Sequence, residues 1–222
     1  KILIFGGNGF IGSHVAEKLF ESNYNIYLFD LKKSKNLNKN FKTISGDILD
    51  ENKVNRSVKG MDYVYNFAAI SDLDQAITKP LETAKVNIIG NINILNACVK
   101  NKINKFIYAS SVYAESAHGS FYQISKQASE NYIKEYNKTY GINYTILRYG
   151  SLYGPRSDKT NGVWRIINDA LKNNQISYQG NINSMREYIH VEDAALASVK
   201  MLESKFNQET VVLTGQESMK VI

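Results

Sequence analysis

Short apolar runs alternate along most of the chain with stretches in which apolar residues recur at helical spacing. The runs predict strands at residues 1–5, 26–29, 41–45, 63–67, 105–109, 143–147 and 210–213. The stretches between them predict helices at residues 10–20, 81–101, 121–140, 163–171 and 191–202. Because strands and helices alternate, and because the strands are almost continuously apolar, we expect an α/β fold with a parallel sheet buried on both faces.

The pattern loosens in the last third of the chain, where glycines at positions 150, 154 and 162 punctuate loops. We therefore divide the chain into residues 1–150, which hold most of the alternating elements, and residues 151–222, a smaller part interleaved with the last of them. The sequence stops at Ile222, soon after the last predicted strand, and we expect the smaller part to be incomplete.

Composition excludes several classes of protein. The 222 residues are 43% hydrophobic and 22% charged, which is ordinary for a globular chain. The net charge of +6 favours lysines spread over the surface over a nucleic-acid site, because the basic residues do not alternate with aromatic ones. No apolar run approaches the ~18 residues that a membrane span needs. Cys98, the one cysteine, excludes an internal disulfide and fits a cytoplasmic protein, and the three scattered histidines predict no metal site.

Four glycines lie between the first predicted strand and the first predicted helix. Gly7, Gly9 and Gly12 fit the dinucleotide fingerprint, and Gly6, Gly9 and Gly12 also repeat at three-residue spacing. Glycines in this context allow a tight turn and a close approach of pyrophosphate to the backbone, at a helix N-terminus with free N–H groups. They predict a Rossmann-type, doubly wound sheet that binds a dinucleotide.

Asp30 ends the second predicted strand, about 20 residues after the glycines, where a carboxylate binds the ribose hydroxyls of adenosine. A carboxylate there repels a 2′-phosphate, so we expect NAD rather than NADP as the cofactor. Lys32 and Lys33 lie close by and keep NADP as the alternative.

Tyr122 and Lys126 are four residues apart in a predicted helix and therefore share one face. Because an ammonium favours the phenolate, we expect Lys126 to lower the pKa of Tyr122 from its ordinary value of about 10. The pair can then remove a proton from an alcohol while a nicotinamide accepts hydride. Ser111 follows the fifth predicted strand and can offer its hydroxyl to the same alcohol oxygen, with Ser110 as a competitor for that role.

Seven motifs follow one another along the chain: residues 6–12, Gly46-Asp47-Ile48, Asn66-Phe67-Ala68-Ala69, Ala109-Ser110-Ser111, Tyr122-Gln123-Ile124-Ser125-Lys126, residues 148–156 and Arg186-Glu187-Tyr188-Ile189-His190-Val191. In this order they resemble the motifs of the extended short-chain dehydrogenases/reductases, the NAD-dependent epimerase/dehydratase family typified by UDP-glucose 4-epimerase.

The resemblance assigns roles to individual residues. It implies a catalytic set of Ser111, Tyr122 and Lys126, and a substrate-binding pair of Asn87 and Arg186, the arginine holding the diphosphate of a nucleotide sugar. The cofactor-binding residues that it and the glycine motif imply are Gly6, Gly9, Phe10, Ile11, Gly12, Asp30, Asp47, Ile48, Ala68, Ala69, Tyr122, Lys126 and Tyr149. A homodimer formed through the helices at 81–101 and 121–140 is also implied.

The chain departs from the family pattern after Ser111. Only Val112 to Phe121 separate this serine from Tyr122, which is a shorter segment than family members usually carry. The 4,6-dehydratases of the family carry an Asp-Glu pair just after the serine or threonine, whereas Val112 and Tyr113 stand here, with Glu115 as a distant substitute. The sequence therefore favours a nucleotide-sugar epimerase that oxidises and re-reduces a sugar hydroxyl, at C4, through a keto intermediate. The alternatives are a dehydratase, decarboxylase or reductase of the same family, or a non-catalytic NAD(P)-binding regulator.

Overall fold

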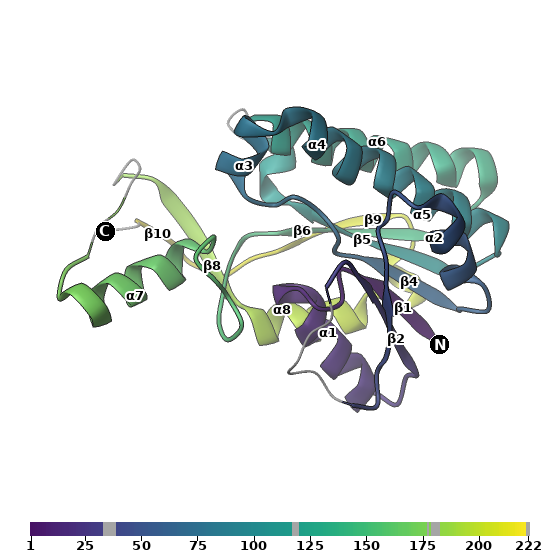
Figure 1. Cartoon of the computed structure of the whole chain (residues 1–222), viewed down its shortest axis with the longest axis horizontal. Coiled ribbons are helices and arrows are strands. Elements are labelled where there is room, and N and C mark those ends of the chain that lie inside the picture. The colour runs from purple at the N-terminus through teal and green to yellow at the C-terminus, as the bar shows by residue number, and fades with distance from the viewer. Residues whose placement is uncertain (33–38, 117–119, 177, 179–182, 221–222) are drawn as a thin grey trace.

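A seven-stranded parallel sheet forms the centre of the protein in the computed structural model, which describes residues 1–32, 39–116, 120–176, 178 and 183–220 (Figure 1). Its strands are β1 (Ile2–Phe5), β2 (Ile26–Asp30), β3 (Lys42–Ser45), β4 (Tyr63–Asn66), β5 (Lys105–Ser111), β6 (Tyr144–Tyr149) and β9 (Glu209–Leu213). They lie in the order β3-β2-β1-β4-β5-β6-β9, and every pair is parallel. The predicted Rossmann-type sheet is confirmed.

Helices cover both faces of this sheet (Figure 1). One layer contains α1 (Phe10–Glu21) and α8 (Val191–Lys200), which pack against each other. The other contains α2 (Glu51–Val58), α5 (Gly90–Lys100) and α6 (Ser120–Tyr140). Each layer buries its own apolar core against the sheet, one around Leu95 and Phe106, the other around Val15 and Leu147. The sheet is therefore buried on both faces, which explains its continuously apolar strands.

The helix predicted at residues 81–101 is divided. It consists of α4 (Pro80–Ala84), a π-helical turn (Lys85–Ile89) and α5, and a short helix, α3 (Leu73–Thr78), precedes it. Pro80 at the start of α4 is compatible with a first helical position, since its missing N–H is not needed there. The π-helical turn matters for the site because it contains Asn87.

A small lobe extends from the carboxyl edge of the large sheet (Figure 1). It consists of a three-stranded sheet, β7 (Ser151–Tyr153), β8 (Met185–His190) and β10 (Ser218–Lys220), together with α7 (Gly162–Asn173). Strand β7 runs parallel to β8, and β10 runs antiparallel to it. After β8 the chain returns to the large body through α8 and β9, so its last third contributes to both sheets.

The sequence pattern does not reveal two kinds of element. Helix α2 buries only Val54 and Val58 as apolar side chains, too few for a recognisable period. In β8, no residue is fully buried, since Met185 and Glu187 are exposed and the other four are half-buried, so neither face is strongly apolar. These elements depend on their tertiary neighbours more than on their own periodicity.

Cys98 lies on α5 in the interior, with 1% of its surface exposed. Burial raises the pKa of its thiol well above the ordinary value, so the thiolate is disfavoured. Among the residues that the structure describes, no helix combines the length and apolar character that crossing a membrane demands.

The start of α2 gives a test of the fold. The Asp50 side chain accepts a hydrogen bond of 2.9 Å from the backbone N–H of Lys53 and so caps this helix. We expect Asp50→Ala to lower the free energy of unfolding by about 1 kcal/mol, because an N–H of the first turn loses its partner. Asp50→Asn, which keeps an acceptor, should cost much less. Urea unfolding of both variants makes the comparison, and equal losses in the two would contradict the cap.

Candidate functional site

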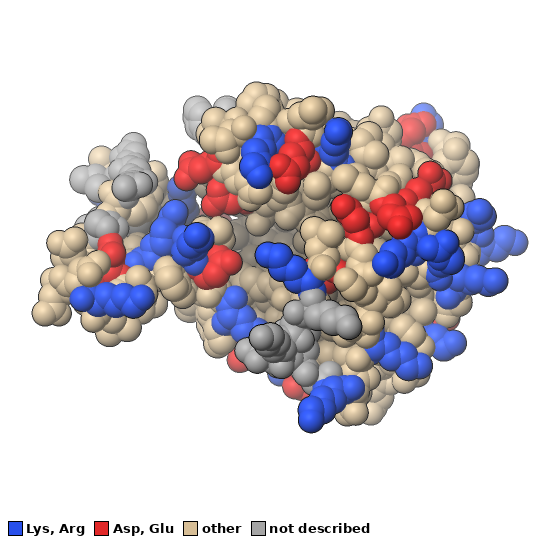
Figure 2. All heavy atoms as spheres, viewed as in Figure 1, with Lys and Arg blue, Asp and Glu red and all other residues tan. Residues whose placement is uncertain are grey.

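Most of the predicted site residues lie where the carboxyl ends of the central strands meet. The glycine turn follows β1, Asp30 ends β2 and Ser111 ends β5. The strand order reverses between β1 and β4, the kind of place where open α/β sheets bind their ligands. Figure 2 shows the surface hollowed over this region, between the large body and the small lobe, with acidic and basic side chains at its rim.

Two close backbone approaches shape the turn after β1. Gly6 has a φ of 70°, and a Cβ on it would lie 2.7 Å from the backbone N of Ala68. A Cβ on Gly12 would lie 2.3 Å from the carbonyl oxygen of Gly6. Helix α1 therefore begins directly against the turn. No side chain caps its first turn, so the N–H groups of Phe10 and Ile11 are suited to an anion such as a pyrophosphate.

The Asp30 carboxylate is fixed against the glycine turn. It accepts hydrogen bonds from the backbone N–H groups of Asn8, at 3.0 Å, and Lys32, at 3.2 Å. Each oxygen keeps further acceptor capacity, which suits ribose hydroxyls. The Asn8 amide also donates to the Lys32 carbonyl. Lys33, which the sequence brings near Asp30, lies outside the described residues.

The segment after β3 is arranged by local hydrogen bonds. Asp47 accepts a hydrogen bond of 2.9 Å from the backbone N–H of Leu49. Ile48 is buried against Gly90 of α5, and its carbonyl accepts a hydrogen bond of 3.0 Å from the Asn93 side chain. These contacts hold the segment at the sheet edge, beside the end of β2.

A buried asparagine pair supports the loop after β4 that contains Ala68 and Ala69. The Asn66 amide accepts a hydrogen bond from the Ala68 N–H and donates one to the Asn91 side chain, at 3.0 and 2.9 Å. Among described residues, the buried side-chain atoms without a partner are Nδ2 of Asn91 and Oδ1 of Asn8. One orphaned atom lies in the glycine turn and the other beside the end of β4. Together with the uncapped start of α1, they fit a polar dinucleotide at this edge.

The predicted catalytic residues come together between β5 and α6. Tyr122 and Lys126 are 8% and 4% exposed and face the sheet from α6. The Lys126 Nζ donates a hydrogen bond of 2.7 Å to the Ala109 carbonyl and lies 5.7 Å from the centre of the Tyr122 ring. The Ser111 hydroxyl hydrogen-bonds Tyr122 and accepts a bond of 3.2 Å from the backbone N–H of Tyr113. The structure thus places a serine, a tyrosine and a lysine in one buried cluster.

The expected lowering of the Tyr122 pKa is wrong for this cluster. Burial raises the pKa of Tyr122 to about 12, although the hydrogen bond with Ser111 acts in the opposite direction. Burial also lowers the pKa of Lys126 to about 7. Desolvation opposes the charged form of both groups, so the protein alone favours a neutral phenol.

Ser110 does not compete with Ser111 for the substrate-facing role. Its hydroxyl donates a hydrogen bond of 2.5 Å to the Glu130 carboxylate, which also receives two bonds from Arg148. Sequence reasoning did not single out Glu130, although it lies four residues after Lys126 on the same helix and so shares its face. Glu115, considered as a substitute acid, is paired with Arg148.

Asn87, predicted to bind substrate, is 2% exposed and fully engaged by the protein. Its amide nitrogen donates to the Ile70 carbonyl, at 3.0 Å, and to the Ser125 hydroxyl, at 2.9 Å. Its amide oxygen accepts from the Ile70 N–H at 2.8 Å. With both amide hydrogens occupied, Asn87 ties the loop after β4 to α6 and leaves no donor for a substrate.

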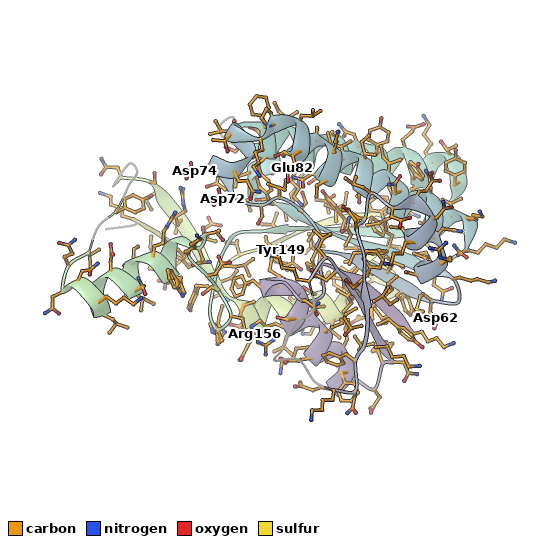
Figure 3. The ribbon with its side chains drawn as sticks, viewed as in Figure 1. Asp62, Asp72, Asp74, Glu82, Tyr149 and Arg156 are labelled. Atoms are coloured by element: carbon orange, nitrogen blue, oxygen red, sulfur yellow. The ribbon has the colours of Figure 1, made fainter. Side chains whose placement is uncertain are left out.

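Tyr149 and Arg186 lie on different parts of the site. Tyr149 ends β6 at the centre of the molecule (Figure 3), and its hydroxyl lies 2.7 Å from that of Ser198 on α8, so only its ring and backbone can face a cofactor. Arg186 lies on β8 of the small lobe, half-buried, with a hydrogen bond of 3.1 Å to the Met185 carbonyl. Among the described residues, no hydrogen bond or ion pair joins Arg186 to the Tyr122 cluster.

An arginine joins the small lobe to α1, the helix that follows the glycine turn. Arg156, which follows β7 with a φ of 66°, donates to the Ser13 hydroxyl at 3.0 Å and to both Glu17 oxygens at 2.8 and 2.7 Å (Figure 3). His14 lies 3.0 Å from the Pro155 carbonyl, so it has a structural contact on the same helix. The left-handed backbone at Arg156 is held by these bonds, which fix the entry to the small lobe.

Comparison with known proteins supports this geometry. Residues 2–214 match the model of the NAD dependent epimerase/dehydratase family. A putative UDP-glucose 4-epimerase from Methanocaldococcus jannaschii is 35% identical over 98% of this chain and 78% of that protein. A UDP-N-acetyl-alpha-D-glucosaminuronate decarboxylase from Bacillus cytotoxicus is 31% identical over 100% of this chain and 77% of that protein.

A solved structure is similar over nearly the whole chain. It is the UDP-glucose 4-epimerase from Thermotoga maritima with UDP-glucose, 32% identical, with a TM-score of 0.91. The match covers 99% of this chain and 78% of that one. The similarity therefore includes the small lobe as well as the large sheet.

The contact between Gly12 and Gly6 can be tested by substitution. We expect Gly12→Ala to lower the free energy of unfolding by about 1–3 kcal/mol, because a methyl group 2.3 Å from a backbone oxygen forces the turn open. Gly162→Ala is the matched control, since a Cβ at the start of α7 meets nothing within 4 Å. Denaturant unfolding measures both, and a Gly12→Ala protein as stable as the control would refute the close approach.

Proposed function

This chain belongs to the NAD dependent epimerase/dehydratase family, and from that premise we propose that it is a nucleotide-sugar epimerase that inverts a hydroxyl, at C4, through a keto intermediate. The observation that carries the proposal is the buried cluster of Ser111, Tyr122 and Lys126 at the same edge of the sheet as the glycine turn. The named activities of the relatives from Methanocaldococcus jannaschii and Thermotoga maritima support C4 of a UDP-linked hexose as the reacting position.

Each residue of the cluster has a distinct task in this proposal. Ser111 donates its hydroxyl hydrogen to the reacting sugar oxygen and so orients it toward Tyr122. The Tyr122 phenolate oxygen takes the hydroxyl proton during oxidation and returns it during reduction. The Lys126 ammonium, fixed by the Ala109 carbonyl, stabilises the phenolate form. NAD, when bound, supplies the hydride acceptor and donor, and its positive ring adds to the charge that favours phenolate.

The residues around the sheet edge fit NAD. The first turn of α1 would bind the pyrophosphate, and Asp30 would accept hydrogen bonds from the ribose hydroxyls. Asp47, Ile48, Ala68 and the Tyr149 backbone would line the remaining length of the cofactor. The Asp30 carboxylate, held by two backbone N–H groups, repels a 2′-phosphate, which favours NAD over NADP.

We assign the substrate to the hollow between the large body and the small lobe. Arg186 would bind the diphosphate, because a guanidinium offers paired donors to phosphate oxygens. Asn87, with its amide engaged by Ile70 and Ser125, acts as a positioning residue for α6. The half-buried side chains of β8 then determine which sugar nucleotide fits.

A homodimer is part of the proposal. The outer surface of the helices after β4 and β5 exposes large apolar side chains, with exposed fractions of 68% at Leu81, 56% at Ile124 and 45% at Tyr132. Apolar groups that are exposed on neighbouring helices are typical of a face that associates with a second copy.

A decarboxylase is the second candidate, favoured by the relative from Bacillus cytotoxicus. It would use the same oxidation at C4 but requires a sugar with a carboxylate at C6. A dehydratase is less well supported, because Val112 and Tyr113 provide no acid and base after Ser111 and because Arg148 engages Glu115.

Turnover of a panel of sugar nucleotides tests the proposed reaction. The panel contains UDP-, GDP-, dTDP- and CMP-linked sugars. We expect one epimer of a UDP-linked hexose to convert into the other without net formation of NADH. Tyr122→Phe should slow this conversion by at least about 100-fold, because the proton acceptor is lost. The NAD bound to the Tyr122→Phe protein is quantified alongside, so that a loss of turnover is separated from a loss of cofactor.

Other outcomes of the panel would overturn the epimerase. Carbon dioxide released from a UDP-linked uronic acid would indicate the decarboxylase, and a 4-keto-6-deoxy product would indicate a dehydratase. Tight NAD binding without turnover of any sugar would indicate a regulator that senses the cofactor.

Cofactor choice gives a separate test at Asp30. We expect Asp30→Asn to narrow the preference for NAD over NADP by at least about tenfold, because removing a charge removes repulsion of the 2′-phosphate. Asp62→Asn is the control with the same charge change, since Asp62 precedes β4 at the opposite edge of the sheet (Figure 3). Calorimetry measures the affinity of each variant for NAD and for NADP. An unchanged ratio of the two affinities in Asp30→Asn would contradict the role assigned to Asp30.

A further inference from the structure

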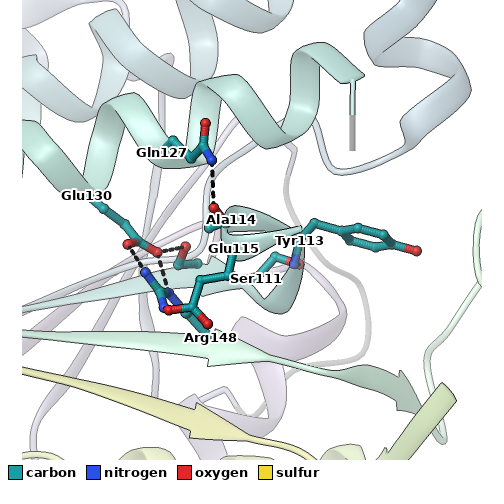
Figure 4. Close-up of polar contacts among 8 residues, drawn as sticks. Ser111, Tyr113, Ala114, Glu115, Gln127, Glu130 and Arg148 are labelled. Atoms are coloured by element: carbon teal, nitrogen blue, oxygen red, sulfur yellow. Dashed lines mark hydrogen bonds and ion pairs between the residues drawn. The ribbon is translucent and has the colours of Figure 1, made fainter. Parts of the chain in front are cut away.

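A buried carboxylate lies one helical turn from the lysine of the catalytic cluster. Glu130 is 3% exposed and follows Lys126 by four residues on α6. Arg148 of β6 donates to both of its oxygens, at 3.0 Å from Nε and 2.6 Å from Nη2, and Ser110 of β5 donates at 2.5 Å (Figure 4). Three hydrogen bonds hold this buried carboxylate in a fixed position.

The carboxylate and the lysine form hydrogen bonds with consecutive residues of the same strand, β5. Lys126 donates to the Ala109 carbonyl, whereas Glu130 accepts from the side chain of Ser110. The next residue, Ser111, hydrogen-bonds Tyr122. Three successive turns of α6 thus contact the last three residues of β5. The packing that places Tyr122 at Ser111 also places Lys126 and Glu130, one helical turn apart, at Ala109 and Ser110.

Among the described residues, Glu130 is the anion whose charge raises the pKa of Lys126. Burial lowers the pKa of Lys126 to about 7, and the charge of Glu130 opposes that change. The other titratable or charged side chains described around the pair are Tyr108, Tyr113, Tyr122, Tyr144, Arg148 and Glu115. Burial raises the pKa of Tyr108, Tyr122 and Tyr144, and the Glu115 side chain, which is 68% exposed, is paired with Arg148.

We propose that Glu130, anchored by Arg148 and Ser110, is a positioning residue that keeps Lys126 protonated and aligned with Tyr122. The effect of Glu130 on turnover rests on the proposed function. Its effect on the charge of Lys126 does not depend on which reaction the protein catalyses. Arg148 belongs to this arrangement because a buried carboxylate needs a paired and hydrogen-bonded cation.

Arg148 also connects this pair to the segment after Ser111. Its second contact is Glu115, in the short helix Val112–Glu115. Gln127 of α6 donates a hydrogen bond of 2.8 Å to the Ala114 carbonyl in the same helix (Figure 4). The shortened segment between Ser111 and Tyr122 is therefore fixed at its start by the group that anchors Glu130.

The experiment is an NMR titration of lysine side chains in the full-length chain without substrate, with the Lys126 signal assigned from Lys126→Arg. We expect Lys126 to titrate near pH 7 in the wild type. In Glu130→Gln the midpoint should fall by at least about one pH unit, because the isosteric amide carries no charge. Glu135→Gln, the control, removes a carboxylate from the exposed face of the same helix and should leave the midpoint unchanged. An unchanged midpoint in Glu130→Gln would overturn the proposal.

A second variant covers the case in which Glu130→Gln does not fold. Glu130→Asp keeps the charge and an oxygen for Arg148 but retracts it by one methylene, so the Lys126 midpoint should fall by a smaller amount. A fall of one pH unit or more in Glu130→Asp would contradict the proposal, because this variant still carries the charge. In an epimerase assay, Glu130→Gln should lower kcat with little change in KM. It should also move the alkaline limb of the kcat profile to lower pH, because Lys126 then loses its proton at a lower pH, whereas a merely structural defect leaves that limb in place. The titration needs no turnover, so a wrong assignment of the reaction leaves its result intact.

Discussion

The packing of helix α6 on strand β5 is the contact on which the site depends. Tyr122, Lys126 and Glu130 lie on successive turns of one helix and reach the last three residues of one strand. A shift of the helix by a single residue would break all these contacts together. Because every group involved is buried, water cannot replace a lost partner, and the register is specified by hydrogen bonding as much as by apolar packing.

Other parts of the fold bring the remaining groups to the same edge. The parallel sheet aligns the carboxyl ends of its strands, and the close approach of Gly12 to Gly6 sets the start of α1 against the turn. Arg156 then ties the small lobe to Ser13 and Glu17 of that helix. The helix that would bind the cofactor therefore also positions the lobe that would bind the sugar nucleotide.

The sequence predicts the large sheet well because its strands are buried on both faces and read as continuous apolar runs. The glycine turn and the Tyr122–Lys126 pair follow from fixed local spacing. Three features depend on tertiary contacts that no local pattern encodes. Strand β8 has no strongly apolar face, the amide of Asn87 is consumed by Ile70 and Ser125, and burial raises the pKa of Tyr122, where a neighbouring charge predicts a fall.

The most direct test of the account follows a labelled hydride. UDP-glucose that carries deuterium at C4 is incubated with the full-length chain and NAD, and the product is examined by NMR. The account predicts UDP-galactose with the deuterium still at C4, because the hydride that leaves this carbon returns to it. Deuterium at C6 of a 4-keto product, as elimination of water would give, or the absence of any conversion of UDP-linked hexoses, would contradict it.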